Sequence, residues 1–280
     1  MLHYIDKEHA PSILPDGKKW TLVWNDEFDG DALDTTKWDY RLHLLHQRHD
    51  TFTNEGVTVS DSKLKIALIE KDGQYYSAQL QTGYNFLDKP SDSKFEGANK
   101  FEWPIAKLDK PKFMHKYGYY ECRCKLQEQP GWWSAFWLQS PIIGASLDPS
   151  YTGIECDIME NFKRDGTCTC GNIWGGYGHD QVISGSDKRT GRLDYNCGEG
   201  DSEGFHIFAV DWSPEGYIFY CDGREVSRTS DPVSDCEQFI LVTTECMGYR
   251  RGNDPSPELK KAVLPDYFTV DYVRVYDEVK

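Results

Sequence analysis

Three acidic residues stand within six positions of the stretch GIECDIMENF: Glu155, Asp157 and Glu160. If this stretch is a β-strand, its side chains alternate between two faces, so Glu155 and Asp157 share one face. Strict alternation would bury Glu160 among isoleucines, where a lone carboxylate is costly. One extra residue, a β-bulge near Ile158 and Met159, returns Glu160 to the acidic face. The sequence therefore predicts a bulge and three carboxylates on one face.

Carboxylates in this arrangement suit the retaining hydrolysis of a glycosidic bond. That reaction needs two carboxyl groups about 5–5.5 Å apart, one as nucleophile and one as acid and then base. On a flat strand Glu155 and Glu160 would lie too far apart, so we expect a sheet that curves towards them. Asp157 would keep the pair in unequal protonation states, because crowded like charges raise the pKa of one member. The alternative interpretation is a solvated acidic patch.

Strand patterns recur along the chain. Apolar and polar residues alternate in YECRCKLQ, which is typical of a half-buried strand. Asp72-Gly73 and Asp222-Gly223 each separate two alternating runs, which is typical of a hairpin turn. DPSPELKKAV indicates a short helical turn, and LHLLHQRH fits either a helix or a strand. Many short antiparallel strands in a chain of this length predict an all-β sandwich, with residues 1–18 as an N-terminal extension across its surface.

The composition favours an uncharged ligand. The 280 residues carry a formal net charge of -15, so the basic excess that nucleic acid or an anionic membrane requires is missing. The 9 Trp and 17 Tyr leave aromatic area for a binding surface. No apolar run approaches the roughly 20 residues that span a bilayer. The N-terminal stretch lacks a signal-peptide pattern, so we expect a cytoplasmic protein or a trimmed secreted one.

The cysteines and histidines do not predict a metal site. Nine cysteines cannot all pair, and no C-x-x-C spacing occurs, so most are expected to be reduced, small apolar core residues. His43, His46 and His49 follow one another at a spacing of three, which neither a helix nor a strand gathers well.

The segment ECDIME resembles the E-x-D-x-x-E signature of glycoside hydrolase family 16 in its bulged form. Four further blocks are similar to that family in order and spacing: WTLVWNDEFDGDALDTTKW, YGYYECRCKLQEQPGWWSAFWLQS, FHIFAVDWSPEGYIFYCDGREV and VDYVRVYD. The resemblance implies a β-jelly-roll sandwich of two antiparallel sheets with a concave substrate cleft, built as one catalytic domain over residues 19–280. It also implies roles by matched position: Glu155 as nucleophile, Asp157 as its electrostatic helper and Glu160 as acid/base.

Aromatic and basic residues near these blocks are candidate sugar contacts, since aromatic faces stack on the apolar faces of sugar rings. Alternation places Trp133 and Trp137 on one strand face and Trp132 on the other; core packing is the alternative for each. The candidate substrate-binding residues are Trp133, Trp137, Trp132, Trp174, Tyr177, Trp103, Arg41 and His46.

Two features depart from the best-known branch of the family. The Asn-Asn-Glu-like loop of laminarin-cleaving relatives is missing, and Gln139 replaces a more usual apolar residue. No cofactor is required by the resemblance. Many relatives bind a structural calcium on the convex side, and Glu27 and Asp271 match those regions.

These features together predict an endo-acting, retaining β-glycosidase of a β-1,3- or mixed-linkage β-glucan, active as a monomer on a polysaccharide or oligosaccharide. One alternative keeps the chemistry on a β-galactan, as in an agarase, a porphyranase or a host-glycan endo-β-galactosidase. A transglycosylase is a further enzymatic alternative. A non-catalytic carbohydrate-binding sandwich is the alternative outside enzymes.

Overall fold

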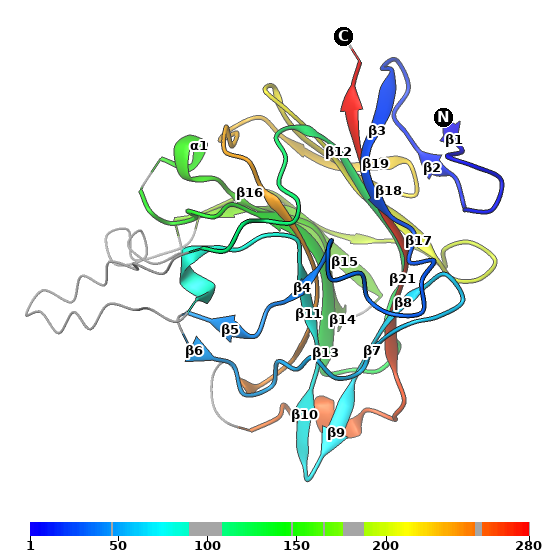
Figure 1. Ribbon diagram of the computed structural model, residues 1–280, viewed down its shortest axis with the longest axis vertical. Coiled ribbons are helices and arrows are strands. Elements are labelled where there is room, and N and C mark those ends of the chain that lie inside the picture. The colour runs from blue at the N-terminus through cyan, green and yellow to red at the C-terminus, as the bar shows by residue number, and fades with distance from the viewer. Residues whose placement is uncertain are drawn as a thin grey trace, which may run out of the picture.

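In the computed structural model, the chain is described at residues 1–45, 47–89, 108–146, 148–164, 166–175, 188–249 and 254–279. Two antiparallel sheets face each other (Figure 1). The 7-stranded sheet runs, in spatial order, β16 (Lys188–Asn196), β15 (Thr167–Trp174), β14 (Glu155–Arg164), β13 (Trp132–Gln139), β20 (Phe239–Cys246), β11 (Gln79–Gln81) and β4 (Asp39–Tyr40). The predicted all-β sandwich is confirmed.

The 8-stranded sheet forms the other layer. Its order is β19 (Arg224–Thr229), β18 (Gly216–Cys221), β17 (His206–Ser213), β12 (Gly118–Lys125), β21 (Tyr267–Glu278), β8 (Leu64–Ala67) and β7 (Val57–Val59), and β3 (Trp20–Asp26) also pairs with β21. Three two-stranded ribbons join β1 (Leu2–His3) to β2 (Ser12–Ile13), β5 (His43–Leu44) to β6 (Gln47–Arg48), and β9 (Ile69–Lys71) to β10 (Gln74–Tyr76). The described helical segments are α1 (Pro149–Thr152), η1 (Phe86–Asp88) and η3 (Leu259–Lys261).

The local turn predictions are confirmed. Asp72 and Gly73 take φ values of 54° and 82° in the turn between β9 and β10. Asp222 and Gly223 take 51° and 74° between β18 and β19. The predicted helical turn is η3, and the ambiguous LHLLHQRH segment contains the β5–β6 ribbon.

The core lies between the two sheets. Phe136 and Val242 from the 7-stranded sheet belong to one buried cluster with Phe208 and Val273 from the 8-stranded sheet. All nine cysteines are reduced; seven of them are buried, as expected of small core residues, whereas Cys197 and Cys236 are half-buried. Within the described residues, no helix is long and apolar enough to span a membrane.

The N-terminal extension covers the outer face of the 8-stranded sheet, and β1 and β2 lie at the upper right of Figure 1. The guanidinium of Arg274 in β21 holds it, donating from Nη1 to the Ala10 carbonyl and to Ser12 Oγ, each over 2.9 Å. The same guanidinium donates to Glu27 over 2.9 and 2.7 Å.

This cover corrects one prediction. YECRCKLQ was expected to be half-buried, but β12 is buried on both faces along seven of its eight residues. Tyr119 on its outer face donates to the Ile13 carbonyl of the extension over 2.9 Å. Arg123 on the same face is paired with Asp201 and Asp271. Tertiary contacts therefore bury polar side chains that alternation alone assigned to solvent.

Candidate active site

Strand β14 carries the three acids and contains the predicted bulge. Its register with β13 pairs Phe136 with Met159 and Trp137 with Asp157, so Ile158 is the extra residue. Both Ile158 and Met159 are fully buried. The bulge prediction is confirmed, because two consecutive apolar side chains can both enter the core only if the alternation slips by one.

The acids consequently share a face with their cross-strand partners. Glu160 lies opposite Ala135, and Asp157 lies opposite Trp137 on one side and Gly171 of β15 on the other. A side chain at Gly171 would meet the backbone of Arg192 in β16, with its Cβ 2.8 Å from Cα, and the residue takes a φ of 145°. Glycine thus lets β16 approach beside the middle acid.

Asp157 is the most buried of the three acids. Burial raises its pKa well above the usual range, and the charges of Glu160 and Glu155 raise it further. Arg189 and Arg192 of β16 act in the opposite direction. Burial and the neighbouring acids therefore favour the protonated form of Asp157, as expected where like charges are crowded.

Glu155 is held by a chain of polar side chains that the sequence analysis did not find. Gln139 at the end of β13 donates from Nε2 to Glu155 Oε2 over 3.2 Å. Asn85 donates to Oε1 of that same Gln139 and, over 2.9 Å, to Asp88 Oδ2. Arg41 donates from Nε to Asp88 Oδ2 over 2.6 Å. The chain of contacts joins four segments that are distant in sequence, so spacing along the chain could not indicate it.

Two tryptophans lie on the acidic face and differ in exposure. Trp137 is 8% exposed, donates from Nε1 to Thr243 Oγ1 over 2.9 Å, and lies under the Arg41 guanidinium at 5.3 Å from the ring centroid. Trp133 is only partly buried and lies against Phe162, with ring centroids 5.5 Å apart. Trp133 therefore offers the accessible aromatic surface beside the acids.

A small pocket opens next to the acids. Its lining residues are Asp157, Glu160, Thr169, Cys170, Gly171, Asn172, Ile173, Arg189 and Arg192. Two acids and two arginines therefore line one small space beside the acidic strand.

The comparisons with known proteins agree with this geometry. The family model described as "Beta-porphyranase A-D, GH16 domain" matches residues 20–278 and includes all three acids. The chain belongs to glycoside hydrolase family 16. The catalytic domain of an endo-1,3-beta-glucanase (laminarinase) from Thermotoga petrophila RKU-1 has the same fold, with a TM-score of 0.65 at 24% identity over 94% of this chain and 100% of that one. The expected jelly-roll sandwich of this family is thereby confirmed.

Two curated relatives carry different substrate names. Glucan endo-1,3-beta-glucosidase A1 of Niallia circulans is 25% identical over 92% of this chain, and the alignment spans 38% of its length. Beta-porphyranase D of Zobellia galactanivorans is 31% identical over 58% of this chain, and the alignment spans 35% of its length.

Two candidate substrate contacts of this family 16 chain are corrected by the structure. Trp132 is fully buried in the main core and donates from Nε1 to Asp266 over 2.9 Å, because the register turns it away from the acidic face. Trp174 follows Ile173, which pairs with Glu155, so alternation places Trp174 on the opposite face. A third candidate, Arg41, is 5% exposed and bonded to Asp88 and Gln79, so it supports the site by packing over the Trp137 ring.

Three further candidates, Tyr177, Trp103 and His46, lie outside the described residues.

The calcium residues that the family implies do not fit a cation in this chain. Both carboxylate oxygens of Glu27 accept from Arg274. Asp271 accepts from Arg123 over 2.5 Å and lies 3.6 Å from Lys63 Nζ. Calcium takes about six to eight oxygen ligands, whereas these two carboxylates are already neutralised by cationic side chains.

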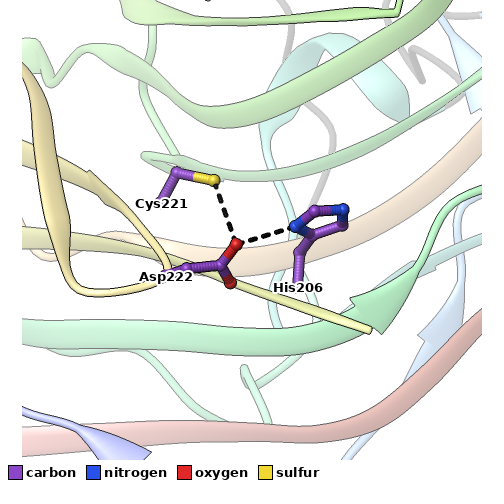
Figure 2. A group of neighbouring side chains, drawn as sticks. All are labelled: His206, Cys221 and Asp222. Carbon is purple, nitrogen blue, oxygen red and sulfur yellow. Dashed lines mark hydrogen bonds and ion pairs between the residues drawn. The ribbon is translucent and has the colours of Figure 1, made fainter. Parts of the chain in front are cut away.

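One group of metal-ligating type lies together among the described residues. His206, Cys221 and Asp222 place their ligand atoms within 4.8 Å of one another (Figure 2). They belong to β17, β18 and the following turn of the 8-stranded sheet, whereas the acids belong to the 7-stranded sheet. Their contacts are those of a hydrogen-bonded group: Asp222 Oδ2 lies 2.8 Å from His206 Nδ1 and 3.7 Å from Cys221 Sγ.

Proposed function

We propose that this family 16 chain is an endo-acting, retaining β-glycosidase that hydrolyses a β-1,3- or β-1,3-1,4-glucan. The observation that carries the proposal is the bulge at Ile158, which gives Glu155, Asp157 and Glu160 one common face. Two carboxyl groups on either side of one glycosidic bond are what double displacement requires.

In the proposed mechanism, Glu155 attacks the anomeric carbon of a sugar bound against Trp133. Gln139 orients the attacking carboxylate with an amide donor, which forms a hydrogen bond to it without transferring a proton. Glu160 protonates the departing glycosidic oxygen, which leaves a glycosyl-enzyme ester on Glu155. Glu160 then removes a proton from water as the water attacks the same carbon, and the sugar leaves with its original configuration.

Asp157 would serve as the proton-holding neighbour of this pair. It is buried between Glu155 and Glu160, and burial favours its protonated form. Protonated, it can donate a hydrogen bond to a neighbouring carboxylate, so the cluster need not carry three negative charges at once.

The names of two relatives support a glucan as the substrate. The Niallia enzyme and the Thermotoga catalytic domain are both named for endo-1,3-β-glucan cleavage, and each aligns with more than nine-tenths of this chain. The formal net charge of -15 also disfavours a polyanionic polymer.

A β-galactan is the second candidate, and a specific observation favours it. The matching family model is named for porphyranases. Arg189 and Arg192 also line the pocket beside Asp157 and Glu160, where their guanidinium groups would bind an anionic substituent on a sugar.

Product analysis tests the proposal. Wild-type protein and Glu155→Ala are incubated with laminarin, mixed-linkage glucan, agarose and porphyran, and Glu203→Ala serves as a control at an exposed acid. We expect the wild-type protein and Glu203→Ala to release oligosaccharides from a glucan, and Glu155→Ala to release none. Cleavage of porphyran or agarose alone would overturn the glucan assignment. Binding to a polymer without cleavage would indicate a carbohydrate-binding sandwich.

A further inference from the structure

Two thiols meet at the edge of the 7-stranded sheet. Cys168 in β15 donates to Cys197, which directly follows β16, with 3.4 Å between the sulfur atoms. The register pairs Cys168 with Tyr195, two residues before Cys197, so both thiols lie on one face of the β15–β16 hairpin. A disulfide bond is about 2.05 Å long, so the sulfur atoms must approach by only about 1.4 Å.

The two thiols differ in accessibility. Cys168 is fully buried in the core, whereas Cys197 is half-buried and packs against that core from its rim. A thiol pair with one accessible and one buried member has the arrangement of an attacking and a resolving cysteine.

The surroundings of Cys197 stabilise its thiolate. The hydrogen bond from Cys168 lowers the pKa of Cys197 to about 6, and although burial opposes this, the positive charge of His206 lowers it further. His206 is held for this role by Asp222, which accepts from Nδ1 over 2.8 Å and raises the histidine pKa against the effect of burial (Figure 2). The charges of the hydrogen-bonded group described above thus act on Cys197 in opposite directions: His206 lowers its pKa and Asp222 raises it.

We propose that Cys168 and Cys197 are a redox-active pair that closes to a disulfide by exchange with a small disulfide such as oxidised glutathione. The Cys197 thiolate attacks one sulfur of the reagent and expels one thiolate, giving a mixed disulfide on Cys197. The Cys168 sulfur then attacks Cys197 Sγ and expels the second thiolate, which takes up the Cys168 proton. Two protein thiols are oxidised and one small disulfide is reduced to two thiols.

The bond would fasten an edge strand that borders the pocket. Strand β16 is an edge strand of the 7-stranded sheet, where it pairs with β15, and it carries Arg189 and Arg192. Closing Cys168 to Cys197 ties the C-terminal end of β16 to the neighbour of the acidic strand. We therefore expect oxidation to raise Tm by several degrees, since a cross-link restricts the unfolded chain.

The test uses the whole chain and a readout independent of glycosidase activity. The protein is incubated with oxidised glutathione in the presence of EDTA, quenched with acid and analysed by intact mass and by peptide mapping without reduction. The expected result is a loss of about 2 Da, the two thiol hydrogens, with a linked peptide pair containing Cys168 and Cys197. Peptide mapping of the wild-type chain requires no variant to fold.

Variants assign the two roles. Cys168→Ala should retain glutathione on Cys197 as a stable adduct, and Cys197→Ser should take up neither glutathione nor the cross-link. Cys236→Ser, at the other half-buried cysteine, should still form the bond. An unchanged mass in the wild-type protein, or a linked pair of other cysteines, would overturn the proposal.

Discussion

Gln139 donates a hydrogen bond to Glu155 over 3.2 Å, from the end of β13 to the start of β14. It links the proposed nucleophile to Asn85, Asp88 and, through them, to the buried Arg41. The orientation of Glu155 therefore depends on side chains from the edge of the sheet.

Replacing Gln139 with leucine should lower kcat. A hydrogen bond to a charged group contributes about 1.5–3 kcal/mol, so we expect a loss of roughly 10- to 100-fold. Steady-state kinetics and thermal unfolding, measured together, separate this effect from loss of the fold. An unchanged kcat at unchanged Tm would show that Glu155 is oriented by other contacts.

Removing each proposed catalytic carboxylate should give a different product with azide. Glu160→Ala should lose roughly 10²- to 10⁴-fold in activity on polymer, and on an activated aryl glycoside azide should restore turnover with a β-configured glycosyl azide. In Glu155→Ala azide replaces the nucleophile directly, so the product should be the α-anomer. Proton NMR of the products distinguishes the anomers. Identical anomers from both variants would contradict the assigned roles.

Asp157→Asn should move the alkaline limb of the pH profile of kcat/KM to lower pH, by about one unit. An amide carries no charge, so the acidic cluster would hold its last proton less tightly than it does beside an ionisable Asp157. The pH profile on a soluble glucan measures the shift. If kcat/KM fell at every pH while both limbs stayed at the same pH, Asp157 would have a purely structural role.

Trp133→Ala should raise KM roughly fivefold to tenfold, because an aromatic stacking contact contributes about 1 kcal/mol beyond the buried area. Trp174→Ala is the matched control, since the register places that ring on the other face of the sheet. Inhibition by oligosaccharide products gives the same comparison without turnover. Equal effects of the two substitutions would argue against a stacking role for Trp133.

Glu121→Gln should stabilise the protein at alkaline pH. Burial raises the pKa of Glu121 from 4.5 to about 7. Because the folded state holds this proton more tightly than the unfolded state, the free energy of unfolding falls as pH rises from 4.5 to about 7. The accumulated loss is about 3 kcal/mol, and a neutral amide should avoid it. Urea unfolding at pH 8 should show the gain, and at pH 4.5 the two proteins should be alike.

Part of this site could be predicted from the sequence, because the cost of burying the Glu160 carboxylate depends on the residues next to it in the strand. Alternation over ten residues shows that Glu160 would be buried unless the strand bulges, and the structure has the bulge at Ile158. The same alternation separated Trp132 from Trp133. It could not tell which of them faces the acids until strand pairing was known.

The support beneath the site could not be predicted in this way. Gln139, Asn85 and Arg41 come together through the order of strands in the sheet, which one sequence does not reveal. The double burial of β12 has the same origin, since its outer face is covered by the N-terminal extension at Tyr119 and by Asp201 and Asp271 at Arg123.

That extension imposes an order on folding during synthesis. Residues 1–18 are synthesised before the sheet that they cover, yet Ser12 bonds to Tyr276 over 2.6 Å and Pro11 accepts from Tyr272 over 3.0 Å, both in β21. The extension must therefore wait for β21 before it can dock, and contacts that close such long loops form late. Until β21 is in place, the outer face of β12 stays exposed. The carboxyl of Glu121, which is buried in the folded protein, is then also exposed to solvent.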